Sequence, residues 1–256
     1  MPVEPHRGGG RVEGGNRVER NRRRRSQAFL TAGLRIVTEE GLEALTMARL
    51  ADDLDTAVGS VYRYYGSKSD LIAAIQGQAI EQLRRSHDAS VTPMVAAVAP
   101  TLVESEALVR LVVLGRWMAA AAQRYEQEVR LLQMVSSRRA STLSRAGAAD
   151  LMGPTMALVM AVSGTIEAAI TAGDLDEGGD PLERSIVWLT AFGGVFVAED
   201  LERYLPDVFG GGRLVRRLAA DLFVGWGAPR AAIDRIDAAV DALGRVALLD
   251  DGGQGQ

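Results

Sequence analysis

The stretch from residue 46 to residue 71, TMARLADDLDTAVGSVYRYYGSKSDL, constrains the fold more than any other part of the chain. Leu50 and Leu54 recur at helical spacing behind Thr46, whose hydroxyl can accept a hydrogen bond from a free amide at the start of the helix. Asp55 interrupts this pattern, and aspartate tolerates the left-handed backbone that a sharp connection between helices needs. The pattern predicts two short helices joined by a tight turn.

Residues 57 to 64 continue as a second short helix, with Val61 and Tyr65 four residues apart on its inward side. Small side chains at the leading end of its outward side would let the backbone enter a DNA major groove, which is about 12 Å wide. The outward residues are Val58, Gly59, Ser60 and Arg63. We therefore interpret this unit as a helix-turn-helix that presents its second helix to DNA.

A third helix is predicted to start at Ser67, in the sequence Ser67-Lys68-Ser69-Asp70. This resembles a capping box, in which the serine hydroxyl and the acidic side chain satisfy free amides at the start of the helix. Lys68 would then lie beside the positive end of the helix, where phosphate groups bind.

The motif resembles that of the tetracycline-repressor (TetR) family of bacterial transcriptional regulators. The positions that carry the resemblance are Thr46, Leu50-Ala51, Asp55-Thr56-Ala57, Tyr62, Tyr65, Ser67-Lys68 and Leu71. Asp55 replaces the family's turn glycine, and Ala57 replaces its capping serine, which would leave the cap to Thr56. The resemblance implies phosphate contacts by Thr46, Tyr62, Tyr64 and Lys68, and base contacts by Val58, Gly59, Ser60 and Arg63.

Composition excludes several other classes of protein. The 256 residues include no cysteine and only two histidines, His6 and His87, which argues against disulfides, thiolate metal sites and histidine clusters. The chain shows neither a nucleophile with a base nor a Walker or Rossmann loop, so we expect neither an enzyme nor a cofactor. It also has no apolar run of about 20 residues and no apolar signal segment, which predicts a cytoplasmic protein without a membrane partner.

Charge is distributed unevenly within a net charge of -4. Arg17, Arg20 and Arg22 to Arg25 lie just before and at the start of the first predicted helix and are opposed only by Glu19. A cationic segment on an acidic body suits a protein that binds a polyanion at one end, so phosphate contacts are predicted for Arg22, Arg23, Arg24 and Arg25. The alternative is a solubilising tail; in either case we expect residues 1–20 to be a disordered arm.

No sustained strand pattern is present, so the predicted fold is all-α. We expect a three-helix head that carries the helix-turn-helix at 21–87, a helical ligand-binding and dimerisation domain at 88–249, and a disordered tail at 250–256. Helices are predicted at 22–40, 67–87, 102–122, 125–139, 148–172, 181–204, 211–226 and 229–249. Pro93 and Pro100 are expected to break the connection between head and body, and Pro154 to bend the helix at 148–172.

Methionines recur every four residues in the helix expected at 148–172, with polar side chains among them. Such a lining suits a small, mostly apolar effector oriented by a few polar groups. The predicted effector-binding residues are Arg116, Trp117, Tyr125, Met134, Met152, Met156, Met160, Ser163 and Glu167. The alternative is that a methionine stripe at helical spacing is ordinary core packing.

By the same resemblance, two late helices form a four-helix dimer interface with their symmetry mates. The predicted interface residues are Trp188, Phe192, Val195, Phe196, Leu214, Leu218 and Leu222. A homodimer is also expected because two recognition helices related by symmetry can read half-sites about 34 to 36 Å apart, whereas one helix offers few base contacts. The alternative is that these residues are core within one chain.

The sequence thus predicts a repressor that leaves a palindromic operator in double-stranded DNA when an effector binds the C-terminal domain. Two alternatives remain at this point: a regulator without a small ligand, and a helical dimerisation or binding module that does not contact DNA.

Overall fold

The computed structural model describes residues 10–137, 145–197 and 212–243. Within these ranges every regular element is helical, which confirms the all-α prediction, and no helix is long and apolar enough to span a bilayer. In chain order the elements are α1 (Gly10–Glu40), α2 (Met47–Asp53), α3 (Val58–Tyr62), α4 (Lys68–Val98), the 3-10 turn η1 (Ala99–Thr101), α5 (Glu106–Arg124), α6 (Glu126–Ser137), α7 (Arg145–Thr171), α8 (Pro181–Val197), α10 (Arg213–Gly225) and α11 (Arg230–Ala242).

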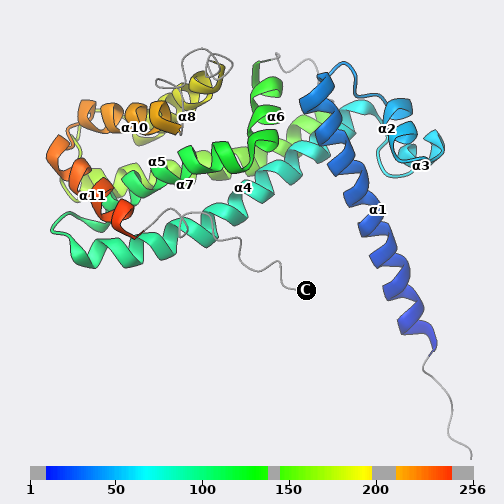
Figure 1. Ribbon diagram of the computed structural model, residues 1–256, viewed down its shortest axis with the longest axis horizontal. Coiled ribbons are helices and arrows are strands. Elements are labelled where there is room, and N and C mark those ends of the chain that lie inside the picture. Colours follow the sequence, from blue (N-terminus) through cyan, green and yellow to red (C-terminus); the bar gives the residue numbers. More distant parts are fainter. Residues whose placement is uncertain (1–9, 138–144, 198–211, 244–256) are drawn as a thin grey trace, which may run out of the picture.

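The head lies at one end of the molecule and consists of α1, α2, α3 and the start of α4 (Figure 1). Its core is made of apolar residues spaced for burial on each helix, including Phe29, Ile36, Val37, Leu45, Leu50, Val61, Leu71 and Ile72. Leu131 of α6 is also fully buried in this core. A helix that follows the head in sequence therefore completes the head's packing.

Local signals in the head are largely confirmed. Thr46 Oγ1 accepts a hydrogen bond from the Arg49 amide at 3.0 Å, and Ser67 Oγ accepts one from the Asp70 amide at 3.1 Å. Asp55 has the predicted left-handed backbone, with φ +46°. These three residues define where α2 and α4 begin and how the chain turns into α3.

The predicted cap on α3 is wrong. Ala57 is the N-cap residue and provides no side-chain hydrogen bond. The hydroxyl of Thr56 instead accepts a hydrogen bond from Arg25 Nη2 at 2.8 Å. The Thr56 hydroxyl was predicted to cap α3, but it is bound to Arg25, which is distant in the sequence.

Helix α4 joins the head to the rest of the chain without interruption. The predicted break at Pro93 is wrong, because the helix continues through this residue. The helix ends at Val98, two residues before Pro100, where a break was also predicted. Proline removes one helical hydrogen bond, but apolar residues at helical spacing are buried on both sides of Pro93, namely Val91, Met94, Val95 and Val98. Burial of this face outweighs the local cost, so the expected boundary at residue 87 falls inside one helix.

The remaining helices form the body around α5, which is buried along most of its length. Trp188 of α8 packs edge-on against Phe223 of α10, with ring centroids 4.9 Å apart. Gly115 of α5 allows α10 to approach closely, since a Cβ at this position would lie 3.0 Å from that of Ala219. The Asp180 carboxylate caps α8 by accepting a hydrogen bond from the Leu182 amide at 2.8 Å, as the Asp-Pro start predicted.

Helix α1 begins at Gly10, although the sequence predicted a disordered arm over residues 1–20. Arginine and glutamate are good helix formers and favour helix over residues 17–25. The helix also continues through Gly14 and Gly15, which local propensity does not explain. Figure 1 shows this half of α1 extending away from the other helices. Residues 1–9 and the predicted tail at 250–256 lie outside the described residues.

Candidate nucleic-acid interface

Helix α3 is anchored by one side and exposed on the other. Val61 is completely buried and Tyr65 is 8% exposed, so both lie on the inward side as predicted. On the opposite side Gly59 and Arg63 are exposed, and Tyr62 is 53% exposed. The outward face is therefore available to a partner while the helix stays fixed in the head.

The polar groups on this face are already arranged together. Arg63 Nη2 donates a hydrogen bond to Ser60 Oγ at 3.1 Å. Val58, the first residue of α3, is 37% exposed. An exposed guanidinium, a hydroxyl and a small apolar side chain are groups that can read base edges in a major groove.

Aromatic packing holds the end of α3 against α1. The rings of Phe29 and Tyr64 lie edge to face with centroids 5.2 Å apart, and Phe29 and Tyr65 are 6.4 Å apart. Tyr64 is consequently half-buried, whereas Tyr62 is exposed. Burial raises the pKa of the Tyr65 hydroxyl, which makes a hydrogen bond with Ser26 Oγ at 2.9 Å.

Lys68 is the first residue of α4 and lies at the positive end of that helix. Its Nζ donates a hydrogen bond to the Glu43 carbonyl oxygen at 3.5 Å and is 4.0 Å from Glu43 Oε2. These are long contacts that a phosphate oxygen could replace. Thr46 remains exposed although its hydroxyl caps α2.

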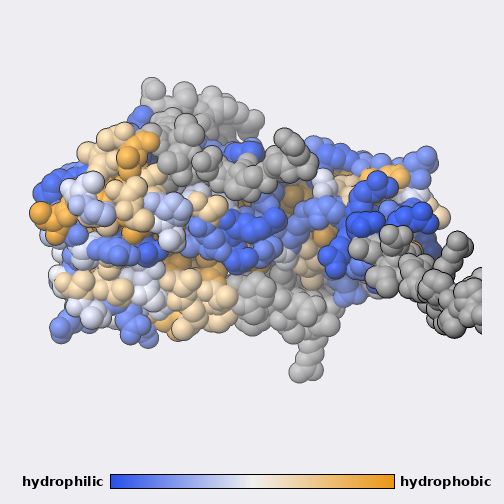
Figure 2. All heavy atoms as spheres, turned by 90° about the horizontal axis from the view of Figure 1, so that it is seen from below, coloured by the Kyte–Doolittle hydropathy of each residue, from blue (hydrophilic) through white to orange (hydrophobic). Residues whose placement is uncertain are grey.

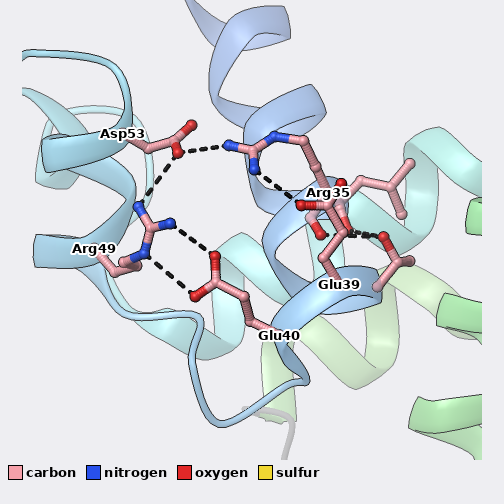
Figure 3. A network of polar contacts seen from close by, with 7 residues as sticks. Arg35, Glu39, Glu40, Arg49 and Asp53 are labelled. Atoms are coloured by element: carbon pink, nitrogen blue, oxygen red, sulfur yellow. Dashed lines mark hydrogen bonds and ion pairs between the residues drawn. The ribbon is translucent and has the colours of Figure 1, made fainter.

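Sequence reasoning missed the ion pairs that fix α2 against α1 (Figure 3). Asp53 Oδ1 accepts hydrogen bonds from Arg35 Nη2 of α1 at 2.5 Å and from Arg49 Nη1 of α2 at 3.2 Å. Arg49 Nη2 also donates to Glu40 Oε1 at 2.7 Å, and Arg35 Nη1 to Glu39 Oε2 at 3.1 Å. The only signal in the sequence was the four-residue spacing between the members of the pairs within each helix.

This network depends on the charge of Asp53. The hydrogen bond from Arg35 lowers the pKa of the Asp53 carboxyl, against the opposing effect of its partial burial. Asp53 is therefore held as a carboxylate. It links α2 to α1 and so fixes the helix that precedes the turn into α3.

The basic residues Arg22 to Arg25 lie on the exposed part of α1. Arg25 contacts Thr56, two residues before α3, and Ser26 contacts Tyr65, three residues after it. Figure 2 shows that hydrophilic side chains cover much of the head on this face, with a smaller apolar patch among them. The structure thus places positive charge beside the exposed outward face of α3.

The residues predicted to bind an effector are not gathered in one place. Arg116, Trp117, Tyr125 and Ser163 are buried in the body, but Met134 packs against the head core. This distribution contradicts a single pocket lined by the whole predicted set.

The outward face of α7 carries another part of that set. Met156 is 45% exposed, Met160 is 54% exposed, and Glu167 is exposed. The side chain of Met152 lies outside the described residues. The inward side of α7 is made instead by Val162, Ile166 and Ala169, so the methionine stripe was assigned to the wrong face.

Arg116 has a structural partner. Only 7% exposed, it forms ion pairs with Asp237 at 3.2 Å and with Asp241, both in α11. Burial raises the pKa of Asp237, whereas Arg116 opposes that rise. Arg116 and Asp237 line a narrow cleft between α5, α10 and α11, and Arg116 is the single predicted effector residue there.

The predicted dimer residues have mixed positions. Trp188 is fully buried within the chain, so its assignment to an intermolecular surface is wrong. Phe192, Val195 and Leu222 pack half-buried against the body core. Leu214 and Leu218 are half-buried on α10, and the side chain of Phe196 lies outside the described residues.

A different side of α8 faces solvent. Ile186 is 50% exposed and Val187 is 46% exposed, and Thr190 and Gly194 continue the same exposed stripe. An apolar helix face of this kind can pack against another helix.

Comparison with known proteins identifies the head. The model of the family described as "Bacterial regulatory proteins, tetR family" matches residues 29–75, from the first buried residue of α1 to the start of α4. The head of this chain is thus similar to the DNA-binding part of tetR-family proteins. A match to a family of regulatory proteins agrees with the expectation that the chain is not an enzyme.

The curated relatives match this chain through the head. The HTH-type transcriptional repressor KstR of Mycolicibacterium smegmatis is 37% identical over 74 residues, which cover 29% of this chain and 35% of the repressor. The match thus spans about a third of the length of that relative.

Solved tetR structures share the fold over most of the chain. A tetR-family regulatory protein from Rhodococcus RHA1 has a TM-score of 0.56 at 20% identity and covers 80% of this chain and 97% of its own. FadR from Bacillus subtilis, solved in complex with stearoyl-CoA, has a TM-score of 0.55 at 14% identity and covers 75% and 96% respectively. At these identities the likeness concerns the fold.

Proposed function

We propose that this chain is a DNA-binding transcriptional regulator that inserts the outward face of α3 into a major groove. The observation that carries the proposal is an α3 fixed by Val61 and Tyr65 and exposed on its opposite side. In this proposal base edges are contacted by Val58, Gly59, Ser60 and Arg63, and phosphates by Thr46, Tyr62, Tyr64, Lys68 and Arg22 to Arg25.

Gly59 offers a test that separates folding from DNA contact. A Cβ at Gly59 would meet no atom within 4 Å in the free protein, and its backbone is not left-handed. Alanine therefore fits without strain and removes the helical penalty of glycine, about 1 kcal/mol. In a groove, however, the added methyl would stand where the backbone of α3 approaches the bases.

Random-site selection with the purified protein is expected to recover a palindrome. Gly59→Ala should keep or raise the melting temperature and weaken binding to that palindrome about tenfold, equivalent to about 1.4 kcal/mol. Gly77→Ala is the matched control, because Gly77 lies in α4 and a Cβ there also meets no atom within 4 Å. Wild-type affinity in Gly59→Ala would exclude groove insertion of α3, and failure to recover any motif at low salt would favour a helical module that does not bind DNA.

The operator is proposed to be a palindrome read by a homodimer. The exposed stripe of α8, formed by Ile186, Val187, Thr190 and Gly194, supports a helix-to-helix contact with a second copy. Leu214 and Leu218 of α10 are proposed to extend this contact. Two recognition helices related by a twofold axis would then read half-sites one helical turn apart.

We further propose that the regulator is a repressor released by a small, mostly apolar effector in the body. Ser90 of α4 is completely buried and its hydroxyl has no hydrogen-bond partner. One turn earlier, Ser86 Oγ accepts a hydrogen bond from Trp117 Nε1 at 3.2 Å. An unpaired buried hydroxyl is costly and would be satisfied by a polar group on a ligand.

The position of Ser90 connects such a ligand to the head. Ser90 and Lys68 belong to the same continuous helix, α4. A ligand that binds one arrangement of α4 more tightly than another would change the separation of the two heads. FadR, which shares the fold, holds stearoyl-CoA, so acyl-CoA esters belong among the first compounds tested.

A thermal-shift screen that includes stearoyl-CoA is expected to find a compound that raises the melting temperature and releases the operator. Ser90→Ala should keep operator binding and lose about tenfold in effector affinity, the scale of one hydrogen bond of about 1.4 kcal/mol. Ser185→Ala is the control, because Ser185 is equally buried but its hydroxyl donates to the Pro181 carbonyl at 2.7 Å. The effector proposal fails if a broad library yields no compound, or if Ser90→Ala responds as the wild type does.

A further inference from the structure

The first half of α1, residues 10–25, forms an arm that no buried side chain anchors among those described. Side chains from Arg17 to Arg25 are all exposed, and the first buried one is Phe29. At 1.5 Å per residue the arm extends about 24 Å. Figure 1 shows it leaving the head with no other helix beside it.

The base of the arm lies beside both ends of α3. Arg25 donates a hydrogen bond to Thr56, two residues before α3, and Ser26 bonds to Tyr65, three residues after it. The arm therefore starts next to the recognition helix, on the part of the head that faces DNA in the proposed function.

The composition of the arm favours a polyanion over other partners. Between residues 17 and 25 six side chains are arginine, and Glu19 is the sole acid, paired with Arg23 at 3.2 Å. Val18 is the one apolar side chain in that stretch, so the arm lacks the apolar face with which helices lie on membranes. An isolated helix of this length is marginal in water, and phosphate contacts would stabilise it by relieving repulsion among the arginines.

We infer that the arm lies along the DNA outside the half-site contacted by α3, with its arginines on phosphates. This inference rests on the proposed function and extends it from a single groove contact to the flanking duplex. An arm of about 24 Å covers about seven base pairs at 3.4 Å each. Since phosphate contacts carry no sequence information, the flanks add affinity and a longer footprint without a longer motif.

The test compares operator fragments with long flanks and fragments trimmed to the selected palindrome. Wild-type protein is expected to bind the trimmed fragment more weakly and with a smaller salt dependence. Arg20→Gln/Arg24→Gln, which neutralises two residues on one side of the arm, should reduce this difference between fragments. The slope of log K against log salt should fall by about 0.9 for each phosphate that the variant no longer neutralises.

Arg84→Gln/Arg85→Gln is the charge-matched control, because these arginines are 58% and 61% exposed on the part of α4 beyond the head. It should keep the wild-type response to trimming. The inference is overturned if the arm variant responds to trimming as the wild type does, or if its salt slope equals that of the control. Failure of the proposed function would be distinct, because wild-type protein would then select no palindrome at all.

Discussion

At the scale of single residues, Asp53 decides the orientation of the helix-turn-helix. Its Oδ1 atom accepts hydrogen bonds from Arg35 of α1 and from Arg49 of α2 (Figure 3). The hydrogen bond from Arg35 lowers its pKa, so the ionised form stabilises the folded head. That contribution is complete above the ordinary aspartate pKa of about 3.9 and is lost as the pH falls through the lowered value.

Asp53→Asn should therefore lower the melting temperature at neutral pH. The difference in melting temperature between this variant and the wild type should disappear as the pH falls below about 3.9, because residue 53 is then uncharged in both proteins. Asp52→Asn, at the exposed neighbouring position, is the control and should change little. Thermal unfolding from about pH 7 to about pH 2.5 measures both, across the range in which aspartate titrates, and a gap that stays constant with pH would contradict the electrostatic role.

Residue-scale features were predictable where the partner is local. Thr46, Asp55 and Ser67 act through nearby amides or through their own backbone angles, so their roles could be deduced from sequence. The contact between Arg25 and Thr56 could not, because it depends on where α1 lies against the turn. The same long-range contact explains why Thr56 does not cap α3.

At the scale of elements, the order and type of the helices were predictable, but not their ends and faces. Pro93 was expected to stop α4, yet the buried side chains around it keep the helix continuous. In α7 and α8 apolar residues occur on every side, so periodicity alone could not tell Met160, which is exposed, from Ile166, which is buried. Tertiary packing determines which side of each helix is buried, and the local sequence pattern carries no information about that packing.

At the scale of the whole molecule, the proposed operator requires two copies held at a fixed separation. Trp188 was predicted to lie between them, but it packs inside the chain against Phe223. The exposed stripe with Ile186 and Val187, on the same helix, remains available for a contact with a second copy. The proposed contact between copies therefore lies on a different side of α8 from Trp188.

Val187→Glu should convert the proposed dimer to a monomer, because it places two charges against each other across the symmetry axis in an apolar contact. Val103→Glu is the control, since Val103 is 93% exposed outside this stripe. Sedimentation and binding to full and half palindromes measure the outcome. A Val187→Glu protein that remains dimeric would rule out this face.

Leu131 has a practical consequence for protein engineering. Because α6 contributes this side chain, and Met134 beside the core, to a head built mainly from α1 to α4, a fragment cut after residue 87 would leave a void where Leu131 packs. Chimeras that graft this head onto a foreign regulator need to transplant α6 as well, or supply an apolar side chain of similar volume at the junction.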